Sequence, residues 1–71
     1  MTLLDAEIGR DYTIKSINTF DEELNSFLFS LGCYSGETIR IISVTRKNFT
    51  IVLKDSRYSI DSQLAEAIEI M

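Results

Sequence analysis

The 71-residue sequence contains no histidine, no proline and no tryptophan, and it has a single cysteine, Cys33. Without histidine, the chain lacks the commonest metal ligand and the commonest general base of enzymes. A lone thiol cannot form an internal disulfide, which favours a reducing compartment and therefore the cytoplasm. These absences argue against an enzyme, so we expect no catalytic residues, no dedicated metal site and no cofactor.

Positive charge is also scarce, because seven Lys and Arg stand against eleven Asp and Glu and give a net charge of −4. Binding to nucleic acid or to an anionic membrane surface depends on Lys and Arg, so the composition argues against both partners. No apolar run approaches the about 20 residues that a membrane span needs, and the N-terminus does not resemble a signal peptide. The hydrophobic content of 45% is typical of a folded chain, and we expect one domain over residues 1–71.

One helix is well defined by its two ends. Thr19 and Glu22 have the spacing of a capping box, and Gly32 stands where a left-handed C-terminal cap is expected. Five apolar residues between these signals recur at helical spacing and are predicted to face the core: Phe20, Leu24, Phe27, Leu28 and Leu31.

Five short strands are predicted, over residues 11–17, 37–44, 49–54, 57–60 and 67–70. The alternation slips between Ile41 and Ile42, which predicts a β-bulge. Residues 45–48 are predicted to form a four-residue hairpin loop with Asn48 in a left-handed conformation, and Asp61 to cap one helical turn. An N-terminal arm is expected to pack through Leu3, Leu4 and Ile8.

This order of elements predicts a mainly β fold. Five strands with so little mass are best accommodated in a small, strongly bent barrel, which also removes exposed edges. We therefore expect an SH3-like barrel of about five strands, with one inserted helix and a short helical turn before the last strand.

A Leu-Gly-x-x-x-Gly segment, formed by Leu31, Gly32 and Gly36, is the most specific motif. Together with segments 3–5, 8–9, 28–32, 36–44, 58–60 and 64–68, it resembles the FeoA family, the small cytosolic accessory proteins of bacterial ferrous iron transport. The resemblance covers nearly the whole chain. Family members usually carry proline where Ser35 stands, and many have a longer loop in place of residues 45–48.

The resemblance implies an SH3-like fold, an association with transition metal ions, and a role beside the membrane GTPase-permease FeoB. We therefore expect a non-catalytic accessory module of ferrous iron uptake that docks on the cytosolic part of an FeoB-like partner, without inserting into the membrane. The same module forms the C-terminal domain of iron-dependent repressors. The alternative is thus a stand-alone SH3-like regulatory domain, and a homodimer through the helix face or a strand edge also stays open.

Phe29 is the residue that suggests a docking surface. It lies about 180° from the core face of the helix, beside Glu22 and Asn25, and an exposed aromatic ring often marks a contact surface. Alternatively, the ring closes an open end of the barrel or meets the N-terminal arm. Tyr34, in the following turn, is its natural neighbour. The candidate partner-binding residues are Glu22, Asn25, Phe29, Tyr34, Ser35 and Gly36.

Two further features are given structural interpretations. Cys33 follows the helix C-terminus, whose partial negative charge opposes a thiolate, so we expect a small buried thiol. Arg46 and Lys47 lie together in a hairpin, with Arg40 and Lys54 on flanking strands. This basic group is interpreted as a solvated loop, with weak contact to an acidic partner as the alternative.

Overall fold

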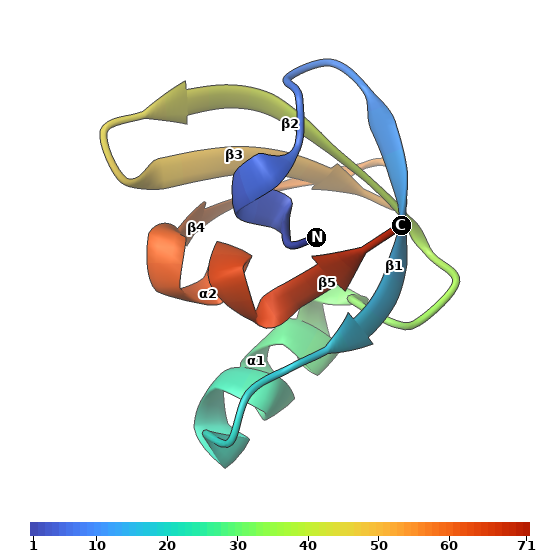
Figure 1. The fold of residues 1–71 in the computed structure, drawn as a ribbon, viewed down its shortest axis with the longest axis vertical. Coiled ribbons are helices and arrows are strands. Elements are labelled where there is room, and N and C mark those ends of the chain that lie inside the picture. The colour runs from blue at the N-terminus through green and yellow to red at the C-terminus, as the bar shows by residue number, and fades with distance from the viewer.

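The computed structural model describes residues 1–71. It contains five strands and two α-helices in the order β1 (Asp11–Ile17), α1 (Glu22–Leu31), β2 (Thr38–Thr45), β3 (Asn48–Leu53), β4 (Ser56–Asp61), α2 (Ser62–Ala67) and β5 (Ile68–Ile70), preceded by a short 3₁₀ helix, Leu3–Asp5 (Figure 1). The first strand has the predicted bounds. The helical turn predicted before the last strand is the six-residue helix α2. It includes Ala67, which was predicted to be the first residue of that strand.

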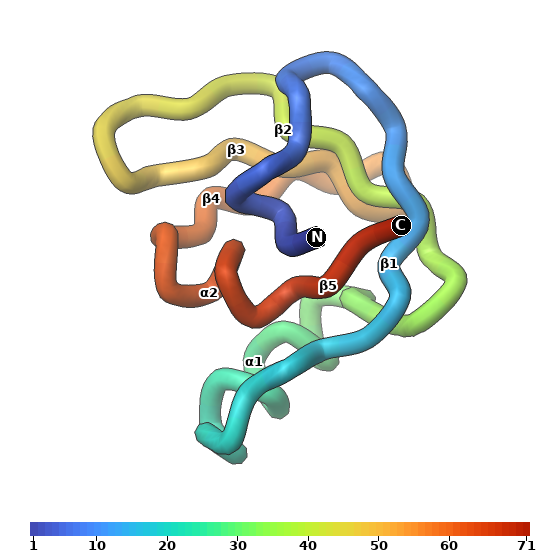
Figure 2. The backbone as a smooth tube through the Cα atoms, in the orientation of Figure 1, coloured from blue at the N-terminus to red at the C-terminus, as the bar shows by residue number.

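All five strands pair antiparallel in one sheet, in the order β4-β3-β2-β1-β5. The sheet curls around a single core, and α1 is inserted between β1 and β2 and extends away from it (Figure 1). The two ends of the chain lie near one another (Figure 2), and an isolated bridge joins Thr2 to Glu69. The predicted mainly β architecture is confirmed, although β4 and β5 do not pair and the sheet is therefore not closed.

The core is entirely apolar, with no buried polar or charged side chain. In β3, alternate residues point inward as predicted, namely Phe49, Ile51 and Leu53. The predicted bulge in β2 is also confirmed, because the register with β3 shifts between Ile41 and Ser43. Sixteen residues form the buried cluster: Leu3, Tyr12, Ile14, Leu28, Cys33, Ile39, Ile41, Phe49, Ile51, Leu53, Ile60, Leu64, Ala65, Ala67, Ile68 and Ile70.

The start of α1 differs from the prediction. Its N-cap is Asp21, whose Oδ1 accepts hydrogen bonds from the backbone N–H groups of Glu23 and Leu24 at 2.9 and 3.3 Å. The predicted capping box between Thr19 and Glu22 does not form, since the Thr19 hydroxyl instead accepts from the N–H of Asp21. The end of the helix is as predicted, with Gly32 in the left-handed region at φ 98°.

Phe20 was predicted to be a core residue and is fully exposed. Because the cap is Asp21, Phe20 precedes the helix, in the position from which an apolar residue can pack against the fourth helical residue. That residue is Asn25, which offers no apolar surface, so the ring has nothing to cover it.

The core-facing stripe of α1 is narrower than predicted. Only Leu28 is buried, while Leu24 and Leu31 are partly buried against the core. Phe27, also predicted to be inward, is 46% exposed. The helix meets the core through these three leucines, the leucine stripe, and the residues beside them remain in solvent.

One turn is shorter than predicted. The β2–β3 turn has two residues, Arg46 and Lys47, with Arg46 at φ 57°, while Asn48 lies in β3 paired with Thr45. Two-residue hairpin turns match the twist of the strands, which explains why the loop contracts. In the N-terminal arm, only Leu3 of the three predicted packing residues is buried, whereas Leu4 and Ile8 are exposed.

Candidate functional site

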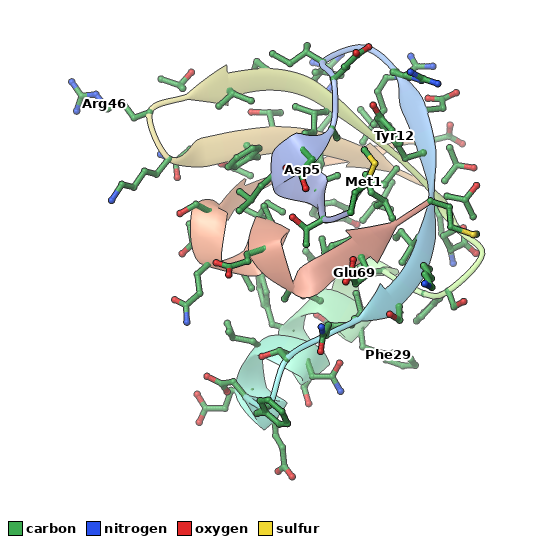
Figure 3. The ribbon with its side chains drawn as sticks, viewed as in Figure 1. Met1, Asp5, Tyr12, Phe29, Arg46 and Glu69 are labelled. Atoms are coloured by element: carbon green, nitrogen blue, oxygen red, sulfur yellow. The ribbon has the colours of Figure 1, made fainter.

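Phe29 is exposed on the outer side of α1, as the helical spacing predicted. Its side chain is 62% exposed, although the preceding residue, Leu28, is completely buried. Figure 3 shows the ring pointing away from the ribbon. The alternative predictions, that Phe29 closes the barrel or meets the N-terminal arm, are therefore wrong, because either contact would bury the ring.

Tyr34 is held next to α1 by the turn that follows the helix. The N–H of Cys33 donates to the carbonyl of Leu28 at 3.1 Å, and the N–H of Glu37 donates to the carbonyl of Tyr34 at 3.0 Å. The turn is also joined to β1, where Gly36 donates to the carbonyl of Ile14 at 2.8 Å. These hydrogen bonds fix the turn to both the helix and the sheet, so Tyr34 is presented from a rigid support.

Phe29 and Tyr34 form an edge-to-face pair, with ring centroids 4.6 Å apart and ring planes at 65°. The ammonium group of Lys54 lies 4.6 Å from the centroid of the Tyr34 ring, which is a cation–π distance. The same ammonium lies 3.8 Å from the carboxylate of Glu37. We call the three residues Phe29, Tyr34 and Lys54 the aromatic patch.

Lys54 was not predicted to belong to this site. It comes from the turn between β3 and β4, and no local sequence signal connects it to Tyr34. Only the curl of the sheet brings that turn against the end of α1. The sequence did place Lys54 among exposed basic residues, which is consistent with its position but did not identify its neighbour.

The other predicted site residues surround the patch less closely. Ser35 and Gly36 are exposed and directly follow Tyr34 in the turn. Glu22 and Asn25 are exposed on α1 and share a side of the helix with Phe29 by their spacing. They lie toward the N-terminal end of the helix, so they extend the same surface.

The chain offers little reactive chemistry. Cys33 is 1% exposed, and burial raises the pKa of its thiol to about 11, so it is the inert buried thiol that was expected. The structure contains no group of three or more His, Cys, Asp or Glu side chains placed to hold a metal ion. Neither helix has the length and apolar content needed to cross a bilayer.

The largest surface hollow, of about 450 Å³, lies away from the aromatic patch, between the start of α1 and α2. Phe20, Leu24 and Ala67 supply its apolar lining, and Asp21 and Glu66 are among its polar residues. The carboxylate of Asp21 is already occupied by two backbone N–H groups of α1. The hollow is open and mostly polar, and we assign no chemistry to it.

A curled sheet of five strands with one inserted helix defines a small, mainly β domain of SH3-like architecture. The family model described as FeoA domain matches residues 1–71, so the chain belongs to the FeoA family. FeoA proteins are accessory domains of ferrous iron transport. A comparison with curated protein sequences finds no significant match.

Solved structures share the fold. FeoA of Stenotrophomonas maltophilia, determined in complex with zinc, superposes with a TM-score of 0.89 at 16% identity and covers 100% of this chain and 89% of that chain. It is described as a prokaryotic SH3 domain protein and proposed to act as a ferrous iron transport activating factor. Iron(II) transport protein A of Clostridium thermocellum gives a TM-score of 0.90 at 24% identity, over 99% of this chain and 44% of that chain.

A similar domain occurs in regulators of transcription. A manganese-dependent transcriptional repressor in complex with manganese gives a TM-score of 0.91 at 16% identity, over 100% of this chain but only 35% of the repressor. At these identities the likeness shows a common fold alone. The fold is therefore used in more than one kind of protein.

Proposed function

We propose that this protein is a non-catalytic accessory module of ferrous iron uptake that acts in the cytoplasm and docks on the cytosolic part of an FeoB-type GTPase-permease. Membership of the FeoA family supports the transport role. The observation that carries the docking is the aromatic patch, in which Phe29 is exposed beside Tyr34 and Lys54.

The patch has the physical properties of a contact surface. Full burial of a Phe side chain is worth about 1.5–3 kcal/mol, and most of the Phe29 ring is still available for burial. Residues that dominate binding energy are often aromatic and sit in preorganised positions. Because Tyr34 is fixed by the turn to α1 and β1, little ordering is needed when a partner covers the patch.

Docking regulates the partner only if the module distinguishes between its conformations. A GTPase changes shape between its nucleotide states, and a module that binds one state better shifts the equilibrium toward that state. The proposed action is therefore preferential binding to one nucleotide state, and it requires neither catalysis nor a bound metal in this chain.

The test is direct binding of the full chain to the cytosolic GTPase domain of the FeoB-type permease from the same organism, loaded with GDP or with a non-hydrolysable GTP analogue. Phe29→Asp is expected to weaken binding at least about tenfold, since it places a charge where the ring is to be buried. Phe20→Asp is the matched control, because it makes the same change at another exposed Phe outside the patch. It is expected to leave binding unchanged.

Two results would contradict the proposal. One is no binding of the unaltered chain to either nucleotide state. The other is an equal loss with Phe29→Asp and Phe20→Asp, which would point to a general effect of negative charge. Equal affinity for the two states would refute the proposed shift in equilibrium while leaving the docking in place.

The second candidate function, a stand-alone regulatory domain for a repressor, is favoured by the structural match to the manganese-dependent repressor. It predicts binding to a DNA-binding domain instead of a GTPase. The same assay, repeated with the DNA-binding domain of a metal-dependent repressor from the same organism, separates the two functions.

A further inference from the structure

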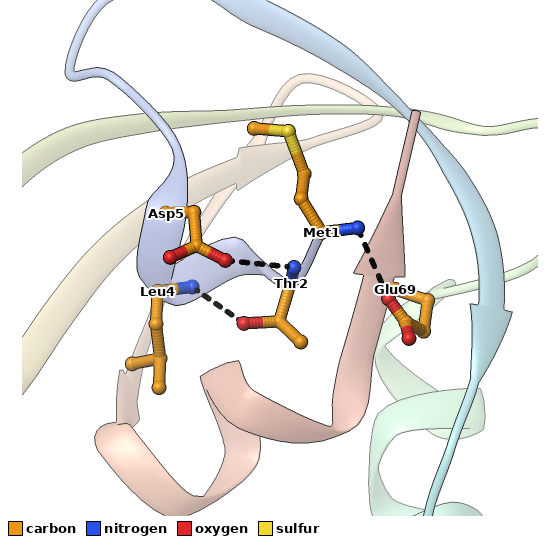
Figure 4. Close-up of polar contacts among 5 residues, drawn as sticks. All are labelled: Met1, Thr2, Leu4, Asp5 and Glu69. Atoms are coloured by element: carbon orange, nitrogen blue, oxygen red, sulfur yellow. Dashed lines mark hydrogen bonds and ion pairs between the residues drawn. The ribbon is translucent and has the colours of Figure 1, made fainter.

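The two edges of the sheet are treated differently by the fold. At the β5 edge, the N–H of Ile70 donates to the carbonyl of Met1 at 2.8 Å, and Thr2 bridges to Glu69. The α-amino group of Met1 also lies 3.6 Å from the Glu69 carboxylate, and a capping box between Thr2 and Asp5 fixes the arm (Figure 4). The N-terminal arm thus covers this edge.

The β4 edge has no such cover. β3 is the only strand that pairs with β4, and no backbone hydrogen bond outside the sheet ladder involves residues 56–60. Six consecutive pairs run from Leu53–Ser56 to Asn48–Asp61 without a register shift. Bulges, prolines and charged side chains, lysine above all, normally protect exposed edges from pairing. β4 contains no bulge, proline or lysine, and its two charged residues, Arg57 and Asp61, have opposite signs.

The turn before β4 determines which backbone groups are free. Lys54 and Asp55 both have positive φ, so they form a two-residue hairpin turn that is closed by the pair Leu53–Ser56. Peptide groups alternate in direction along an antiparallel strand. Those of Ser56, Tyr58 and Ile60 therefore face β3, and those of Arg57 and Ser59 point toward the open edge.

The side chains of β4 are complementary to those of a second antiparallel β4. When Ser59 lies opposite Ser59 of the second copy, Arg57 of each copy lies opposite Asp61 of the other. In the same register, Tyr58 lies opposite Ile60, so inward residues meet inward residues and outward residues meet outward ones. A slip of one residue would place apolar residues opposite outward polar ones.

The charges that this register brings together have no ionic partners within one chain. Neither Arg57 nor Asp61 takes part in any of the four ion pairs. Asp61 uses Oδ1 to cap α2, accepting from the N–H of Leu64 at 2.9 Å, which leaves Oδ2 to accept from an arginine. We propose that β4 is an interface at which a second copy of this chain adds, antiparallel and two-fold symmetric about Ser59, to continue the sheet.

The test is the oligomeric state of the full chain by sedimentation velocity over about 1 µM to 1 mM. Ser59→Pro removes the outward N–H at the centre of the interface, and proline is tolerated where an edge N–H faces solvent. We expect this variant to stay monomeric over the whole range. Arg57→Glu places like charges opposite each other twice and is expected to raise the dissociation constant about tenfold or more.

Arg46→Glu is the matched control for the charge change. Arg46 lies at the exposed β2–β3 turn and projects away from the body (Figure 3), so its replacement is expected to leave the dissociation constant unchanged. Circular dichroism establishes that each variant is folded, and if Ser59→Pro unfolds, Arg57→Glu decides. A chain that is monomeric throughout, or a dimer that neither edge variant weakens, would overturn the proposal. The assay contains no GTPase, so its outcome is independent of the docking function.

Discussion

Neighbouring residues of α1 should contribute very differently to stability. Leu28 is the only side chain of this helix that is fully buried, whereas the larger Phe29 is mostly exposed. We therefore predict that Leu28→Ala destabilises the protein several times more than Phe29→Ala. The comparison tests whether the helix is attached to the sheet through the leucine stripe while its other side is available for docking.

The magnitudes follow from burial. Replacing a fully buried Leu by Ala costs about 2–5 kcal/mol, so we expect about 3 kcal/mol for Leu28→Ala. Phe29 buries less than half of its surface, and full burial of a Phe is worth about 1.5–3 kcal/mol, which gives about 1 kcal/mol. Alanine recovers about 0.5 kcal/mol through its higher helix propensity, so the net loss for Phe29→Ala is about 0.5 kcal/mol.

The measurement is equilibrium unfolding in urea, followed by far-ultraviolet circular dichroism and by tyrosine fluorescence, since the chain has no tryptophan. A small domain is stable by about 5 kcal/mol, so Leu28→Ala should retain less than half of that value. Phe29→Ala should have nearly the midpoint of the unaltered chain.

A loss for Phe29→Ala equal to or larger than that for Leu28→Ala would refute the reasoning. It would mean that the outer face of α1 contributes as much to the fold as the leucine stripe. A loss below about 1 kcal/mol for Leu28→Ala would refute it in another way, because the helix would then have no main point of attachment.

Three further predictions follow from the caps and ionisable groups. Cys33, with its pKa raised to about 11 from an ordinary 9.0, should react with iodoacetamide at pH 8 at least about 100-fold more slowly in the folded than in the urea-unfolded chain; equal rates would contradict its burial. Arg40 donates from Nε to Asp11 at 2.6 Å and holds the pKa of that carboxyl below its ordinary 3.8. The pair therefore stabilises the fold above pH 3.8, and this stabilisation is lost on further acidification. The free energy of unfolding of Asp11→Asn should accordingly fall less between neutral and acid pH than that of the unaltered chain. The same pH dependence in both proteins would refute this. Asp21→Ala should lower the free energy of unfolding in urea by about 1 kcal/mol and Thr19→Ala by clearly less, because Asp21 is the N-cap. A larger loss for Thr19→Ala than for Asp21→Ala would instead support the capping box predicted from the sequence.

Several features set by neighbouring residues could be predicted from the sequence, whereas the N-cap of α1 and the length of the β2–β3 turn, which are also local, could not. The bounds of β1, the bulge after Ile41, the left-handed cap at Gly32 and the cap of α2 by Asp61 all follow from short patterns. In each case the determinant is local: a backbone geometry, a period of two, or the Asp61 side chain that accepts from the N–H of Leu64. The fold class followed because few architectures accommodate five short strands with one inserted helix.

Features that depend on distant segments could not be predicted. Phe27 has the helical spacing of a core residue, but its burial depends on how much of the sheet lies within reach of α1. Lys54 lies over Tyr34 only because the β3–β4 turn meets the end of the helix in three dimensions. A periodic pattern identifies the apolar side of a helix, but the number of residues on that side that become buried depends on the surface against which the helix packs.

The same limit explains why the candidate site was partly visible in the sequence. Phe29 could be recognised because it departs from the local period, and a residue that breaks a pattern needs no distant partner to be noticed. The cation above Tyr34 and the open edge at Arg57 break no local pattern, so they emerge only when the strands are placed in order. Because α1 meets the core mainly through Leu28, the Phe29 ring stays largely exposed, with Tyr34 as its edge-to-face neighbour. Under the proposed function, the partner covers this ring, and its burial adds to binding instead of to the stability of the isolated chain.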